Sequence, residues 1–146
     1  VPTSSVITLG TLAEQNKDGA TYVMYSFSSV KGFCKVGQYH GSGTSKNFIW
    51  TGFTPAFLLR KNTSTGDWSM MDNKRFGYNT VLPYFYANSN GVEQTDQNVN
   101  NVDLLSNGFC CRESDSRSNA SGSTYIYYAI ASLPFTTSSG VPATAR

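Results

Sequence analysis

The chain has 146 residues, of which 39% are hydrophobic, 14% aromatic and 14% charged, and its formal net charge is +2. This length suits one compact domain, and the charged fraction lies well below the usual quarter of a soluble globular protein. The basic residues are scattered along the chain, so we expect no nucleic-acid partner. The longest apolar run, residues 125–131, is too short to span a bilayer, so we expect no membrane insertion.

Residues 1–30 are predicted to form a β-hairpin that repeats the sequence of residues 107–133. At a constant offset and without a gap, GATYVMYSF (19–27) falls on GSTYIYYAI (122–130), and SSVITL (4–9) falls on NGFCCR (107–112). The identical pairs at this offset include Asn16/Asn119, Gly19/Gly122, Thr21/Thr124, Tyr22/Tyr125, Tyr25/Tyr128 and Ser29/Ser132. A gapless match with turn and strand in register indicates an internal repeat.

The predicted N-terminal hairpin needs a sheet to join, because a lone hairpin cannot bury its apolar face. It could complete its own domain, end an upstream copy in a longer repeat, or lend strands to a neighbouring subunit. The last two arrangements predict an assembly, since an unpaired strand edge is an association site. We therefore interpret residues 1–30 as a connector or strand donor and residues 31–146 as the body of the protein.

The body shows the two-residue period of β-strands. In KNFIWT (46–51), Lys46, Phe48 and Trp50 share one face of a predicted strand, and Trp50 is predicted to lie in the core. The run PAFLLRK (55–61) is apolar on both faces up to Arg60, which is typical of an inner strand. Short strands of this kind, separated by Gly/Asn turns, predict an all-β fold, an antiparallel β-sandwich or jelly roll.

Several stretches of the body resemble a known family. They are GFCKVGQYHGSGTSKNFIWTGFTPAFLLRKNTSTGDW (32–68), DNKRFGYN (72–79), DLLSNGF (103–109), NASGSTYIYYAIASLPF (119–135) and VPATAR (141–146). In their order and in their amino-acid sequences they resemble a family of β-rich domains in bacteriophage virion proteins, especially tail-fibre-like and other particle-surface proteins. The resemblance implies a virion location, with other virion proteins and further copies of the chain as partners, and it implies no reaction.

The residue types that usually carry catalysis are few. His40 is the sole histidine and lies six positions from Cys34, with a Gly-flanked turn beside it, so we interpret it as a polar loop residue. Asp67 and Asp72 flank Trp68, in a stretch that also reads as a plain turn. The sequence therefore predicts no catalytic residue, no metal site and no cofactor.

Aromatic residues near turns are the remaining signal for binding. We select Trp68, Tyr78, Tyr84 and Tyr86 as candidates for contact with a glycan or with another subunit. Burial of these side chains would favour an architectural role, and exposure around a concave polar site would favour a lectin. We expect a non-enzymatic structural protein of a phage particle, either a tail fibre or spike module or a capsid decoration subunit. The alternative is a tail-fibre adhesin module that binds a glycan on the host surface.

Overall fold

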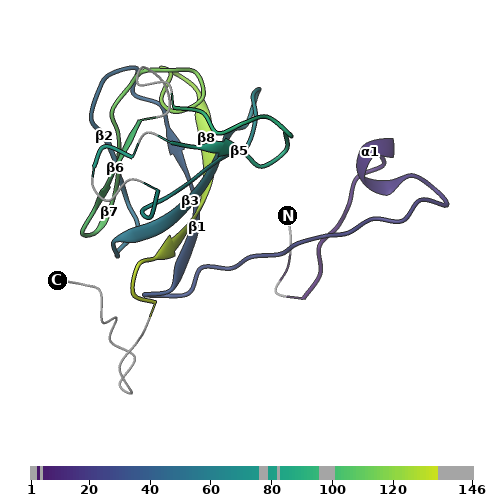
Figure 1. Ribbon diagram of the computed structural model, residues 1–146. Coiled ribbons are helices and arrows are strands. Elements are labelled where there is room, and N and C mark those ends of the chain that lie inside the picture. The colour runs from purple at the N-terminus through teal and green to yellow at the C-terminus, as the bar shows by residue number, and fades with distance from the viewer. Residues whose placement is uncertain (1–2, 4, 76–78, 82, 96–100, 135–146) are drawn as a thin grey trace.

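Two antiparallel β-sheets pack face to face in the computed structural model, which describes residues 3, 5–75, 79–81, 83–95 and 101–134 (Figure 1). The strand order is β1-β8-β3-β4-β5 in the five-stranded sheet and β2-β7-β6 in the three-stranded sheet. The elements are α1 (Ala13–Asn16), β1 (Cys34–His40), β2 (Asn47–Trp50), β3 (Pro55–Asn62), β4 (Ser69–Asp72), β5 (Phe85–Tyr86), β6 (Val102–Leu105), β7 (Gly108–Cys111) and β8 (Thr124–Ala131). The predicted all-β antiparallel sandwich is confirmed.

Aromatic side chains from both sheets fill the space between them. Tyr39 of β1 stacks on Tyr125 of β8 with ring centroids 4.9 Å apart, and Phe109 of β7 meets Tyr39 edge-on at 5.8 Å. Alternate residues of strand β8 point into this core, and the last two of them are the small residues Ala129 and Ala131. Strand β7 is the middle strand of its sheet, β8 lies between β1 and β3, and an edge-on contact of 5.3 Å between the rings of Phe109 and Tyr127 joins the two strands across the layers.

The closing segment of the body is an arch and not a hairpin. Strand β7 lies in the three-stranded sheet and β8 in the five-stranded sheet, so the loop of residues 112–123 carries the chain from one layer to the other. We call residues 108–131 the closing arch. Its two strands pair with other strands of the body and never with each other.

In the part of the predicted N-terminal hairpin that the structure describes, residues 3 and 5–30, no strand is formed. Residues 5–29, which we call the N-terminal arm, contain the single helical turn α1 and no strand, and they project from the body (Figure 1). The physical reason lies in the arch: a segment that copies β7 and β8 has no tendency to pair with itself. Each copied strand needs a neighbour from its own sheet. Whether residues 1–30 act as a connector or strand donor stays a prediction.

The arm leaves the body beside β1. The chain reverses between Val30 and Cys34, whose backbones form an isolated bridge. The Ser29 hydroxyl then accepts a hydrogen bond from Val36 N at 3.0 Å and donates one to Val36 O at 3.3 Å. The Phe27 ring lies 4.6 Å from that of Tyr128. Beyond this attachment the arm is solvated, and every residue from 5 to 30 is exposed.

Candidate interaction surfaces

A row of apolar side chains crosses the outer face of the five-stranded sheet. Strand register places one residue from each strand side by side, in the order Val36, Tyr128, Leu59, Met70 and Phe85. Val36 is 41% exposed and the other four are half-buried. Directly opposed residues share a face of the sheet, so this outer row is a continuous apolar strip on the surface. Such strips mark contact sites on soluble proteins.

A hollow of about 350 Å³ lies against one end of the outer row. Two arm residues, Tyr25 and Phe27, line it together with the sheet residues, and Trp68 from the segment before β4 forms part of its wall. The other lining residues include Val36, Leu59, Ile126 and Tyr128. The hollow is therefore mainly aromatic and aliphatic, and suits a protein side chain better than a polar ligand.

The structure separates the four aromatic residues that the sequence grouped as a candidate site. Trp68 is half-buried and lines the apolar hollow, whereas Tyr84 is 2% exposed and belongs to the core. Tyr86 packs edge-on against Tyr84 with ring centroids 5.4 Å apart and is half-buried. Tyr78 lies outside the described residues. Three of the four positions thus face protein interior or an apolar surface, which is the arrangement expected of an architectural subunit.

The prediction that Trp50 lies in the core is wrong. Trp50 is 59% exposed, and Phe48, on the same face of β2, is 45% exposed. Lys35 Nζ lies 4.0 Å from the centroid of the Trp50 ring and donates a hydrogen bond to Trp50 O at 3.0 Å. A second hollow, of about 580 Å³, opens beside this pair. The sequence held a signal for this exposure, because Lys46 shares the alternating face of Phe48 and Trp50.

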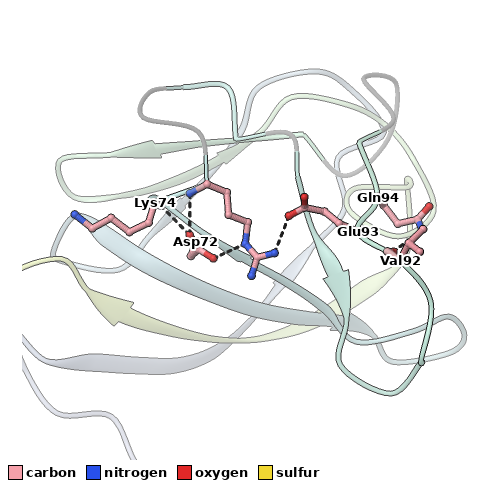
Figure 2. Close-up of polar contacts among 6 residues, drawn as sticks. Asp72, Lys74, Val92, Glu93 and Gln94 are labelled. Carbon is pink, nitrogen blue, oxygen red and sulfur yellow. Dashed lines mark hydrogen bonds and ion pairs between the residues drawn. The ribbon is translucent and has the colours of Figure 1, made fainter.

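An arginine clamp fastens the loop after β5 to the end of β4 (Figure 2). Arg75 makes ion pairs of 2.7 Å with both Asp72 and Glu93, and its guanidinium lies 4.1 Å from the centroid of the Phe85 ring. Burial alone would raise the pKa of Asp72, but hydrogen bonds from the Arg75 side chain and from Lys74 N outweigh it, and the pKa is lowered. The clamp holds Phe85 at the end of the outer row.

The groups considered for catalysis are engaged in different places. His40 is exposed at the end of β1, where its Nδ1 lies 3.2 Å from Thr124 Oγ1. Asp67 accepts a hydrogen bond of 2.8 Å from Asn88, while Asp72 belongs to the arginine clamp. Across the ranges that the structure describes, there is no group of three or more His, Cys, Asp or Glu residues that could hold a metal ion.

Buried polar groups also gather between the sheets. Arg60 is fully buried and its Nη1 lies 3.3 Å from Cys111 Sγ, while Tyr39 donates a hydrogen bond of 2.6 Å to Ser118 O. Burial raises the pKa of Tyr39 well above its usual value, and the positive charge of Arg60 offsets part of that rise. Since Arg60 is inaccessible to solvent, this cluster is part of the interior of the body.

Comparison with known proteins assigns a family. A family model described as a domain of unknown function, DUF7483, matches residues 1–134. The chain belongs to this family. The matched region contains the N-terminal arm and every strand that the structure describes. No curated protein and no solved structure matches the chain. No helix within the described ranges is long and apolar enough to cross a membrane.

Proposed function

We propose that this protein is a non-enzymatic structural component of a bacteriophage particle, a tail fibre or spike module or a capsid decoration subunit. It assembles with copies of itself and with other virion proteins through strand edges and aromatic patches. The virion assignment rests on the sequence stretches between residues 32 and 146 that resemble virion β-domains. The observation that supports assembly is the amount of apolar surface on the arm and the outer row.

The exposed apolar surface is large for a chain of this size. Ten large apolar side chains of the arm and its attachment are at least 44% exposed: Val6, Ile7, Leu9, Leu12, Tyr22, Val23, Met24, Tyr25, Phe27 and Val30. Residues 19–30 contain no charged side chain at all. A contiguous apolar segment of this kind favours association with protein over a solvated state.

Particle composition and imaging test this function. Purified particles of the phage that encodes the chain should contain it at a fixed copy number per particle. Imaging of the intact particle should place it on the surface, in a fibre, spike or capsid decoration. Its absence from purified particles, with abundant protein in the infected-cell lysate, would overturn the proposal.

A glycan-binding role is the second candidate, and the Trp50 surface favours it. An exposed tryptophan beside a hollow lined by Lys31, Lys35 and Ser29 combines a stacking ring with hydrogen-bond donors. In this case titration with polysaccharide from the host surface should shift the NMR signals of Trp50. The substitution Trp50→Ala should abolish binding, and Trp68→Ala should not. Equal binding by both variants, or none by the unaltered protein, would rule this candidate out.

A further inference from the structure

The turn of the N-terminal arm has the same local structure as the turn of the closing arch. In the arch, Ser118 N and Asn119 N donate to Asp115 O at 3.0 and 2.8 Å, and Ser123 N donates to Ala120 O at 3.2 Å. At the equivalent arm positions, Gln15 N and Asn16 N donate to Leu12 O at 3.1 and 2.9 Å, and Ala20 N donates to Lys17 O at 3.2 Å. The glycine that ends each turn has nearly the same positive φ, 73° at Gly19 and 75° at Gly122.

A tyrosine closes both turns in the same way. Tyr125 Oη donates to Ser116 O at 2.8 Å and accepts from Ala120 N at 2.9 Å. Tyr22 Oη donates to Ala13 O at 2.7 Å and accepts from Lys17 N at 2.9 Å. All five hydrogen bonds therefore recur at the same sequence spacing. The arm is a preformed copy of the arch's turn, although no strand of the body lies beside it.

The limb after the arm's turn also carries the inward-facing pattern of β8. In β8 these inward positions are two aromatic residues followed by two small ones, all buried: Tyr125, Tyr127, Ala129 and Ala131. The arm has two large residues followed by two small ones at the equivalent positions, all exposed: Tyr22, Met24, Ser26 and Ser28. Small residues at the last two positions fit the close approach of facing layers. The arm thus has the side-chain pattern of a strand that faces a core, but these side chains are exposed to solvent.

The length of the repeat assigns the arm to a separate unit. Residues 31–133 run from the turn before β1 to just beyond β8, and the strands described within this range form one sandwich. They number 103, which equals the spacing between Tyr22 and Tyr125. The arm therefore stands where the closing arch of another unit would stand, directly before β1 of this one.

We infer that the N-terminal arm is the closing arch of a second β-sandwich unit of the same fold, whose other strands come from outside residues 31–146. That unit presents two sheets that each lack one inner strand. The arm supplies both strands at once, between the counterparts of β1 and β3 and between those of β2 and β6. The body of this chain does not qualify as the acceptor, because β7 and β8 already fill these places.

Polar contacts around the turn indicate that the second unit also provides a loop that binds the arm's asparagine. Asn119 is fully buried, and its side-chain amide group binds the loop before β2 through Ser42 N at 2.8 Å and Thr44 O at 2.6 Å, and the start of β2 through Asn47 Nδ2 at 2.7 Å. The equivalent Asn16 is exposed and donates to Gly10 O at 2.9 Å within the arm. A unit of the same fold would bring its own loop of this kind to Asn16.

A two-unit chain tests the inference. Residues 31–106 are joined directly to residue 4 of the full chain, so that the arm takes the place of residues 107–133 in the added unit. The positive control carries residues 31–133, with their own closing arch, ahead of residues 31–146. We expect calorimetry of the arm version to show the cooperative unfolding of two sandwiches, as in the control. If the control shows two folded units and the added residues of the arm version stay unfolded, the inference is wrong.

Two substitutions in the arm report its orientation. Met24 aligns with the inward-facing Tyr127, whereas Val23 aligns with Ile126 on the outer face. In the two-unit chain, Met24→Asp should unfold the added unit, and Val23→Asp should leave it folded with a smaller loss of stability. In the unextended chain both side chains are exposed, at 62% and 77%, so neither substitution should shift the melting temperature measurably. Equal effects of the two substitutions in the two-unit chain would contradict the inference.

The inference deepens the proposed function, on which it rests only for the biological role of the partner unit. The folding experiment uses purified protein and does not depend on particle incorporation. An arm that closes an added unit, in a protein absent from particles, would leave the inference standing and overturn the function. An arm that fails to close the added unit, in a protein that is present in particles, would overturn the inference and leave the function standing.

Discussion

The N-terminal arm and the closing arch share a turn, a tyrosine corner and a side-chain pattern, but they differ in their surroundings. Tyr125 is fully buried, while Tyr22 is 44% exposed with the same two hydrogen bonds. The comparison shows that the turn is encoded locally, through short-range hydrogen bonds and a glycine with positive φ. The strands on either side are formed only where neighbouring strands complete them.

Truncation of a core side chain gives the largest expected difference between the two regions. Phe109 is fully buried, so Phe109→Ala should lower the free energy of unfolding by about 3–5 kcal/mol. The arm equivalent Val6 is 56% exposed, and Val6→Ala should change it by less than about 0.5 kcal/mol. Urea denaturation measures both. A loss above about 1 kcal/mol for Val6→Ala would show that the arm already packs against a core.

Removal of one hydroxyl sharpens the comparison at the shared tyrosine. Tyr125→Phe removes two partly buried hydrogen bonds, each worth about 0.5–1.5 kcal/mol net, so it should cost about 1–3 kcal/mol. Tyr22→Phe removes the same two bonds where water replaces them, and should cost less than about 0.5 kcal/mol. Denaturation of the two variants side by side checks this. Similar losses would contradict the difference in environment.

The arginine clamp is a feature of the body without a counterpart in the arm, and its loss should cost less than the two body substitutions above. Arg75→Ala breaks two partly exposed ion pairs and a contact with Phe85, and should cost about 1 kcal/mol. As a control, Arg117→Ala breaks one longer ion pair, of 3.5 Å to Asp115, and should cost less than about 0.5 kcal/mol. Equal costs would show that the clamp adds nothing beyond a surface ion pair.

The clamp also gives the chain a pH dependence with a definite sign. The pKa of Asp72 is lowered in the folded protein, so its contribution to stability is present above the unfolded value of about 4. That contribution is lost as the pH falls through the lowered folded pKa. The stability difference between the unaltered protein and Asp72→Asn should therefore shrink below about pH 4. Denaturation curves between pH 2 and 7 check it, and a difference that grows toward acid pH would contradict it.

Much of the fold could be predicted from the sequence because its signals are local. Period-two alternation and Gly/Asn turns predicted an all-β sandwich. The run at 55–61, which is apolar on both faces, predicted an inner strand, and it forms the inner strand β3. Alternation describes faces and not partners, so it could not show that β7 and β8 belong to different sheets. The predicted hairpin was wrong for this reason.

The interaction surface was less predictable because it depends on long-range register. The outer row takes one residue from each of five strands that lie far apart in the sequence. Tyr84 lies in the core, and its backbone bridges Gln94, a contact that no local pattern encodes. Trp50 was a different kind of error, since Lys46 on the same alternating face already indicated an outward direction.

Hydrogen exchange of the arm tests the account most directly. In the isolated chain, amides of residues 21–29 should exchange on the order of 10³-fold faster than those of β8, or more, because only β8 lies inside a sheet. In the two-unit chain the same arm amides should slow to rates comparable with β8. Arm amides that are already as protected as β8 in the isolated chain, or that stay unprotected in a folded two-unit chain, would contradict it.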